Sequence, residues 1–262
     1  MERIVPFHSR QVSRTVAGQT ERQSVPVSAF PREVPAVTTP PPEQARAAII
    51  DVDGTLVDSN YFHTVAWWEA FRQAGHKVAT RDIHRLIGMS GGNLIERLIG
   101  PGHSEEHVSA ISDAHATLFA TWHDRLRPVP GAADLLRALA RRGWRVVLAS
   151  SARGDDLVAL RRAIDADDAI LAATDSDQVD SGKPAPDLVE AALEEARVPP
   201  GRAHFVGDSV WDVISAARVG VPCTALLSGG VGADELKEAG AAAVYDTPAD
   251  LLAHLDTSPL AG

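Results

Sequence analysis

The stretch AIIDVDGTLVDSN, residues 47–59, decides the fold. It begins as an apolar run without polar alternation, which is typical of a β-strand buried on both faces of a parallel sheet. The run ends abruptly at Asp51 and Asp53, and a turn signal at Gly54 follows directly. Two carboxylates side by side at a buried strand end cost free energy unless a cation or a proton compensates them. The stretch therefore predicts a buried strand that ends in a charged site.

Apolar runs and helical periods alternate along most of the remaining chain. Further strands are predicted at residues 144–150, 168–174, 203–208, 222–228 and 242–246. Helices are predicted between them, at residues 131–143, 155–164, 186–196 and 210–220. Strands that alternate with helices predict an α/β fold, here a Rossmann-like, mostly parallel sheet with right-handed crossovers.

Residues 60–128 break this alternation, because they contain helical patterns and no convincing strand. In TVAWWEAFRQAG, Val65, Trp68 and Phe71 lie three apart, which predicts an apolar stripe along one helix. Ligands in open α/β sheets bind beyond the carboxyl ends of the strands, and the insertion grows from that edge. We therefore expect residues 60–128 to form an inserted α-helical cap that covers the site.

The first 44 residues have a composition of their own, with seven prolines and no lysine. Such a segment, without the hydrophobic stretch of a secretory signal, is typical of an extended, solvated tail. We therefore assign residues 1–44 to a disordered tail, 45–59 and 129–262 to the Rossmann-like core, and 60–128 to the cap.

The overall composition narrows the class of partner. A net charge of −10 disfavours a nucleic-acid surface, which needs basic patches. No apolar run approaches the roughly 20 residues of a membrane span. The single cysteine, Cys223, excludes an internal disulfide. These features predict a cytoplasmic monomer or homodimer with neither a nucleic-acid nor a membrane partner.

Polar residues follow four of the predicted elements, and they complement one another. Asp51 and Asp208, with the backbone carbonyl of Asp53, offer the hard oxygen ligands that Mg²⁺ favours. Lys183 can neutralise part of a phosphate's charge, and Ser150 and the N–H groups near Ser151 can donate to its oxygens. If the sheet is doubly wound, these groups converge on one crevice, which predicts a phosphate site with Mg²⁺ as cofactor.

The ordered set DVDGT, LASS, GKPAPD and GDSVWD resembles the four motifs of haloacid dehalogenase-like hydrolases, over residues 46–256. The helical insertion resembles the cap of the subgroup that contains phosphoglycolate phosphatase and β-phosphoglucomutase. The resemblance implies a Mg²⁺-dependent phosphatase that hydrolyses a small phosphorylated metabolite through a phospho-aspartyl intermediate.

The same resemblance assigns roles to individual residues. It makes Asp51 the nucleophile and Asp53 the general acid and base, with Thr55 steadying Asp53. To serve as an acid, Asp53 is expected to have a raised pKa. The other matches are Ser150 and Lys183 for phosphate binding, Asp208 as a magnesium ligand and Asp212 as an outer ligand.

Two other functions stay open from the sequence. A phosphosugar mutase would use the same phosphorylated Asp51 but return the group to a sugar hydroxyl. His63 favours it mildly, since it lies ten residues after Asp53, where β-phosphoglucomutase has a histidine that contacts substrate. The alternative for His63 is an ordinary residue in the first turn of a cap helix. A non-catalytic binding module is the second rival, although neither Asp51 nor Asp53 is missing.

The cap residues allow further alternatives. Trp67 and Trp68 fit a cap core better than a substrate platform. The segment GMSGGN, residues 88–93, forms either a specificity loop or a simple link between helices. The spacing of four cap histidines allows a metal site, but a solvated helical face is favoured because no cysteine or acid cluster completes the set. The four histidines are His103, His107, His115 and His123.

Overall fold

The computed structural model describes residues 45–152, 154–174 and 181–261. Residues 1–44, predicted to be a disordered tail, lie outside the described residues. Among the described residues, no helix combines the length and the apolar character that crossing a membrane would require.

Six parallel strands form one sheet in the order β3-β2-β1-β4-β5-β6. β1 pairs with β2 on one side and with β4 on the other, so that Ile50 lies opposite both Leu148 and Val206. Because β1 and β4 are neighbours, the residues that follow them meet at one edge of the sheet. The strands are β1 (Arg46–Ile50), β2 (Trp144–Ala149), β3 (Ala172–Thr174), β4 (Ala203–Gly207), β5 (Cys223–Leu226) and β6 (Ala243–Tyr245).

Helices alternate with these strands after residue 130. The α-helices are α5 (Ala132–Arg141), α6 (Gly154–Ile164), α7 (Asp187–Ala196), α8 (Val210–Arg218), α9 (Ala233–Glu238) and α10 (Pro248–Ala253). Short 3₁₀ helices lie at Asp167–Ala169, Pro200–Arg202, Leu227–Gly229 and Leu255–Thr257. The α/β fold predicted from the sequence is confirmed.

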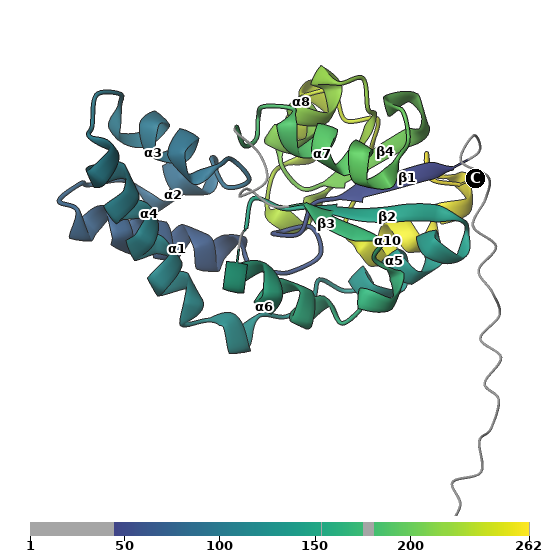
Figure 1. Cartoon of the computed structure of the whole chain (residues 1–262), viewed down its shortest axis with the longest axis horizontal. Coiled ribbons are helices and arrows are strands. Elements are labelled where there is room, and N and C mark those ends of the chain that lie inside the picture. Colours follow the sequence, from purple (N-terminus) through teal and green to yellow (C-terminus); the bar gives the residue numbers. More distant parts are fainter. Residues whose placement is uncertain (1–44, 153, 175–180, 262) are drawn as a thin grey trace, which may run out of the picture. The chain divides into compact units, whose positions relative to one another are not determined.

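The sheet is covered on both faces (Figure 1). Ala48 and Ile50 of β1 belong to a core cluster with residues of α5, α6 and α10. Ala47 and Ile49 belong to a second cluster with residues of α7 and α8. Successive side chains of a strand point to opposite faces, so a strand between two helical layers is apolar at every position. This packing explains the unbroken apolar run before Asp51.

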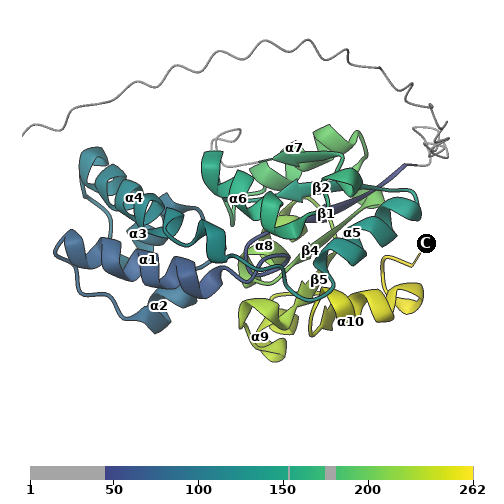
Figure 2. The same ribbon diagram turned by 90° about the horizontal axis from the view of Figure 1, so that it is seen from below.

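The helices at residues 60–120, between β1 and α5, form a helical segment with a core of its own, which is called the cap below (Figure 2). The core includes Trp67, Phe71, Ile83, Leu94 and Ile111, all of them buried. The helices are α1 (Asn60–Gln73), α2 (Thr80–His84), α3 (Gly91–Ile99) and α4 (Glu105–Ala120), followed by a 3₁₀ turn at His123–Arg125.

The apolar stripe predicted on the first cap helix is wrong in two of its three positions. Val65 and Trp68 are 45% and 41% exposed, and only Phe71 is buried. The buried face of α1 instead carries His63, Trp67 and Ala70 among others, and it packs on α4. A polar histidine interrupts the apolar pattern of this face, which is why spacing alone selected the neighbouring one.

The third strand is shorter than predicted. The chain is a 3₁₀ helix at Asp167–Ala169, and β3 begins only at Ala172. β3 is one of the two edge strands, and among the described residues it pairs with β2 alone, in a register of three residue pairs. An apolar segment at a sheet edge lacks a second neighbour that would extend its ladder.

Candidate active site

The acids at the ends of β1 and β4 come together as the parallel sheet requires. Asp51 follows β1 directly, and its N–H donates to the carbonyl of Val206 in β4 at 2.9 Å. Asp208 follows β4, and Asp212 lies in the first turn of α8. Carboxylate oxygens of Asp51, Asp208 and Asp212 all lie within 4.8 Å of one another. All three residues are buried, so their charges act on one another with little screening by water.

Lys183 is the cation in this acid cluster. Its side chain is fully buried, and its ammonium pairs with Asp51 and, at 2.7 Å, with Asp212. It also donates to the backbone carbonyl of Ala149, at the end of β2, at 3.2 Å. Burial alone would lower the pKa of Lys183, but the carboxylates of Asp212 and Asp51 raise it above its usual value. These contacts favour the charged ammonium form of Lys183.

Two donors and two glycines hold Asp208 in place. Thr55 Oγ1 donates to Oδ1 and Asn60 Nδ2 donates to Oδ2, each at 2.8 Å. A Cβ at Gly229 would lie 1.7 Å from Asp208 Oδ2, and one at Gly54 would lie 2.4 Å from it. Gly54 also has φ +74°, a backbone conformation that favours glycine. Both turns therefore need glycine so that the acid can lie against the backbone.

The charges of the acid cluster do not balance among the described residues. Three buried carboxylates, those of Asp51, Asp208 and Asp212, face the single ammonium of Lys183. Burial and the neighbouring acids raise the pKa of Asp51 well above its usual range, although Lys183 opposes them. Burial and Asp212 likewise raise the pKa of Asp208 to about 7. An excess of buried negative charge on oxygen ligands suits a hard divalent cation such as Mg²⁺.

Asp212 also begins helix α8. Its Oδ2 accepts from the backbone N–H of Ser209, and Ser209 Oγ accepts from the backbone N–H of Asp212, which is a capping box. Its Oδ1 faces Lys183. Both carboxylate oxygens of Asp212 therefore have protein partners, which fix this side chain between the start of α8 and Lys183.

Asp53 belongs to a different network from the acid cluster. Its Oδ1 accepts from Ser59 Oγ at 2.5 Å and lies 3.0 Å from His63 Nε2. Burial alone would raise the pKa of Asp53, but His63 and the hydrogen bonds of His63 and Ser59 hold it below its usual value. The sequence argument expected a raised pKa here. The difference arises because the cap places His63 against the Asp53 carboxylate. Burial in the core without this histidine would raise the pKa.

The structure separates the roles of Ser150 and Ser151. Ser150 is fully buried, and its Oγ accepts from the backbone N–H of Ala152 at 3.0 Å. Ser151 lines a cavity beside Asp51 and Asp53, and its buried Oγ has no hydrogen-bond partner among the described residues. A buried hydroxyl without a partner costs free energy, and a phosphate oxygen in the cavity would supply the partner.

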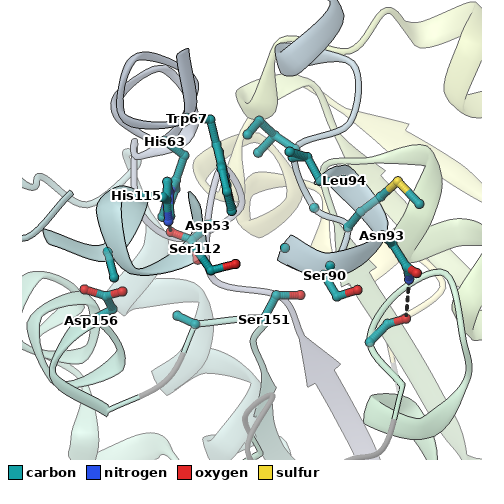
Figure 3. Close-up of a pocket in the computed structure, with 18 of the residues that line it drawn as sticks. Asp53, His63, Trp67, Ser90, Asn93, Leu94, Ser112, His115, Ser151 and Asp156 are labelled. Carbon is teal, nitrogen blue, oxygen red and sulfur yellow. Dashed lines mark hydrogen bonds and ion pairs between the residues drawn. The ribbon is translucent and has the colours of Figure 1, made fainter. Parts of the chain in front are cut away.

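The cavity has a volume of about 460 Å³ and lies between the sheet edge and helices α1, α3 and α4. Figure 3 shows Asp53 and Ser151 near its floor and His63 and Trp67 on the cap side. His63 Nδ1 lies 3.1 Å from His115 Nε2, and Trp67 stacks on His115 with ring centroids 3.9 Å apart. No Lys or Arg is found among the described residues that line it.

The segment at residues 88–93 both links α2 to α3 and lines this cavity. The N–H of Ser90 donates to the carbonyl of Lys183 at 3.2 Å, and Asn93 Nδ2 donates to the same oxygen at 3.4 Å. A Cβ at Gly182 would lie 2.5 Å from Ser90 Cβ, so the two segments approach closely. The cap thus contacts the loop that carries the buried lysine.

Some residues of this site had no role in the sequence argument. Asn60 and Ser59 follow DVDGTLVD at the start of a helix, where a polar pair usually indicates an N-cap. Their side chains instead bond Asp208 and Asp53, and Ser59 makes no capping bond. Gly229 and Asp156 gave no signal, because their contacts with the site arise only from the fold. Thr55, expected to steady Asp53, bonds Asp208 and, at 3.3 Å, Asp51.

Comparisons with known proteins agree with this geometry. The model of the haloacid dehalogenase-like hydrolase family matches residues 45–220. The protein CbbY of Cereibacter sphaeroides is 33% identical over 82% of this chain and 99% of its own length. The phosphoglycolate phosphatase of Rhodospirillum rubrum is 31% identical over 79% of this chain and 89% of its own length.

Among solved structures, a hydrolase from Pseudomonas syringae has a TM-score of 0.77 and 35% identity, covering 81% of this chain and 98% of that one. The mutase alternative is not favoured, because the relative above whose name states its reaction is a phosphatase. The chain therefore belongs to the haloacid dehalogenase-like hydrolase family and is a phosphatase within it.

Proposed function

We propose that the protein is a Mg²⁺-dependent phosphatase that hydrolyses a small phosphorylated metabolite through a phospho-aspartyl intermediate on Asp51. One observation carries the proposal: three buried carboxylates, two of them paired with a single buried lysine, lie together beside a cavity that Asp51 lines. The phosphate-ester chemistry of the relatives supports it.

The metal would be held by Asp51, Asp208 and the backbone carbonyl of Asp53, with Asp212 as an outer group. When bound, Mg²⁺ would offset the charge of the acids and of the incoming phosphate. Lys183 opposes the rise in the pKa of Asp51 and orients its carboxylate through an ion pair, and its positive charge favours the approach of a phosphate. The Ser151 hydroxyl, buried and without a partner among the described residues, would donate to a phosphate oxygen.

The reaction then has two displacements at phosphorus. A carboxylate oxygen of Asp51 attacks phosphorus, and the bond to the leaving oxygen breaks, with its electron pair going to that oxygen. The leaving oxygen takes a proton from Asp53, which lies beside His63. Water then attacks the same phosphorus and gives a proton to Asp53. The bond between phosphorus and the Asp51 oxygen breaks, with its electron pair going to that oxygen, so that inorganic phosphate leaves and the Asp51 carboxylate is restored.

The proton needed by Asp53 is the least obvious part of this scheme. Asp53 is held as a carboxylate by His63 in this structure, with a lowered pKa. We propose that Asp53 and His63 share the proton across the 3.0 Å contact between Asp53 Oδ1 and His63 Nε2, so that Asp53 can donate it when the leaving group departs. His115, within 3.1 Å of His63, continues this contact toward the cap.

The cap is proposed to act as a lid that selects the substrate. Its part of the cavity combines apolar side chains with small polar ones, such as Trp67, Leu94, Ser112 and Asn93. Closure would exclude bulk water from the phosphoryl group. A single chain provides both sides of the cavity, which supports a monomer or a homodimer. The buried Cys223, the one cysteine of the sequence, supports a cytoplasmic location.

The proposal is tested by release of phosphate from a generic aryl phosphate. Wild-type protein is expected to release phosphate with Mg²⁺ and to stop when the metal is chelated. Asp51→Asn should reduce release to background, because an amide is not a nucleophile. Asp234→Asn, at an exposed aspartate of α9, is the matched control and should keep full activity. Activity that survives both chelation and Asp51→Asn would refute the mechanism.

A further inference from the structure

Three histidines of the cap meet away from the cavity just described. His76, His103 and His107 each offer a ring nitrogen, and these three nitrogens lie within 4.8 Å of one another. They come from the loop after α1, the loop before α4 and the first turn of α4. None of them lines the active-site cavity. The cluster therefore needs an explanation of its own.

The backbone fixes two of these histidines. His76 closes helix α1 in a Schellman motif: its N–H donates to Phe71 O at 2.8 Å, and the N–H of Gly75, which has φ +84°, donates to Arg72 O at 3.1 Å. The N–H of His107 donates to Ser104 Oγ, the N-cap of α4, at 3.2 Å. Both imidazoles thus project from helix ends that are held independently of any ligand.

The spacing of the rings suits a shared ion. His76 Nε2 and His107 Nε2 lie 2.9 Å apart. Two imidazole nitrogens on one tetrahedral zinc ion, at 2.0–2.1 Å each, lie about 3.3 Å apart. A small rotation of either ring covers that difference. His103 is exposed, and its ring centroid lies 5.1 Å from that of His107. Its Nε2 would give up a 3.3 Å contact with Ile99 O to bind an ion.

We propose that His76, His103 and His107 form a binding site for a transition-metal ion of the Zn²⁺ type, with solvent at the fourth position. Neutral imidazole nitrogens select zinc, nickel, copper or cobalt, whereas Mg²⁺ prefers oxygen ligands. The protein would thus hold two chemically different metal sites, one of oxygen ligands in the core and one of nitrogen ligands in the cap.

The ion would join two ends of the cap. His76 follows the last turn of α1, and His103 and His107 belong to the loop and first turn that begin α4. α1 and α4 pack on each other and carry His63 and His115, the two histidines of the cavity. A bound ion would fasten these helices at the end opposite to their shared cavity contact and stabilise the cap as a unit.

Sequence spacing alone suggested a different set. It groups His103 and His107 with His115 and His123, and it favours a solvated helical face because no cysteine or acid cluster completes that set. In the structure His115 lies beside His63 and His123 pairs with Asp156 at 2.7 Å. His76, from a distant segment, completes the set instead.

Calorimetric titration of the full chain with Zn²⁺, after chelator treatment and with saturating Mg²⁺ to fill the acid cluster, tests the proposal. Wild type should bind one Zn²⁺ at this site, and His103→Gln and His107→Gln should each weaken that binding roughly tenfold or more, since each removes a ligand. His254→Gln, at an exposed histidine of the core outside the cluster, is the matched control and should bind as wild type. Activity with Mg²⁺ should be the same in His103→Gln, which separates this proposal from the phosphatase mechanism.

Cobalt provides a second readout. Co²⁺ bound by three imidazoles in a tetrahedral site gives visible absorption bands, which should be present in wild type and absent in both cluster variants. Circular dichroism in chelator shows whether each variant is folded. If His107→Gln unfolds, the comparison of wild type with His103→Gln, at an exposed side chain, still tests the site. Equal Zn²⁺ affinity in wild type and folded cluster variants, or cobalt bands that persist in them, would overturn the proposal.

Discussion

The two sides of the cavity hold their polar groups in different ways. On the core side, Asp51 and Asp208 follow neighbouring strands and are bonded by buried donors from both halves of the core. On the cap side, His63 and His115 stack against aromatic rings and against each other. The difference teaches that the sheet topology determines where the reacting acids lie. The packing of the inserted helices determines which groups contact them from the other side. Changes on the core side should therefore cost more than changes on the cap side.

The largest loss is expected from Lys183→Met. Removing this ammonium leaves Asp51 and Asp212 buried without their cation, and breaking a buried pair in this way costs about 3–5 kcal/mol. Phosphatase activity should fall to background, and chemical denaturation in chelator should show the loss of stability. Lys237→Met, at an exposed lysine 3.9 Å from Asp234, should change little. A Lys183→Met protein with wild-type stability would show that the acids do not depend on this cation.

A smaller but sharper loss is expected from Gly229→Ala. The added Cβ would meet Asp208 Oδ2 at 1.7 Å, so this acid must move away from the acid cluster. A displaced metal ligand should lower Mg²⁺ affinity and activity by about 10- to 100-fold, as changes next to metal sites do. Gly232→Ala is the matched control in the same loop, because its Cβ would meet nothing within 4 Å. The titration of activity with Mg²⁺ measures both variants, and equal curves would contradict the role given to Asp208.

These two variants also mark how far the sequence predicts the site. Asp51, Asp208 and Lys183 were predictable, because acids and a lysine that follow parallel strands must meet at one sheet edge. Gly229 was not, since its contact with Asp208 depends on how the loop after β5 turns over the end of β4. Local patterns identify groups that the topology brings together, but they do not identify the residues that leave room for them.

The cap shows the same limit more strongly. Helices in residues 60–128 were predicted, but the buried face of the first helix was not, because His63 interrupts its apolar pattern. The pairing of His76 with His107 depends on how two loops pack and has no periodic signal. A parallel sheet constrains its strand ends, whereas a helical insertion leaves many packings open.

The pH dependence of stability distinguishes the acid cluster with and without metal. Burial and Asp212 raise the pKa of Asp208 to about 7, far above that of an unfolded aspartate. Between about pH 4 and pH 7 the folded protein therefore binds more protons than the unfolded chain. Without metal, the free energy of unfolding should fall as pH rises through this window, by at most about 1.4 kcal/mol per pH unit from this group.

Mg²⁺ should reverse that trend, because it binds the ionised acids. The stabilisation by Mg²⁺ should therefore increase from pH 5 to pH 8, as thermal unfolding with and without chelator measures it. Asp208→Asn should remove the share of both effects that comes from Asp208, while Asp51 keeps its own. A gain from Mg²⁺ that is the same at every pH would show that the acid cluster is already ionised without metal.

The smallest effect is expected on the cap side, from His63→Gln. His63 lowers the pKa of Asp53 both by its charge and by its hydrogen bond, so its loss should raise that pKa and move the matching limb of the pH–rate profile to higher pH. Ser59→Ala removes one hydrogen bond to the same oxygen and no charge, and should move the limb in the same direction by less. If His63 also contacts substrate, the KM of His63→Gln should rise for some phosphorylated metabolites and not for others. If His63 is a helix residue without a role in the site, His63→Gln should have the pH–rate profile and the substrate preference of wild type.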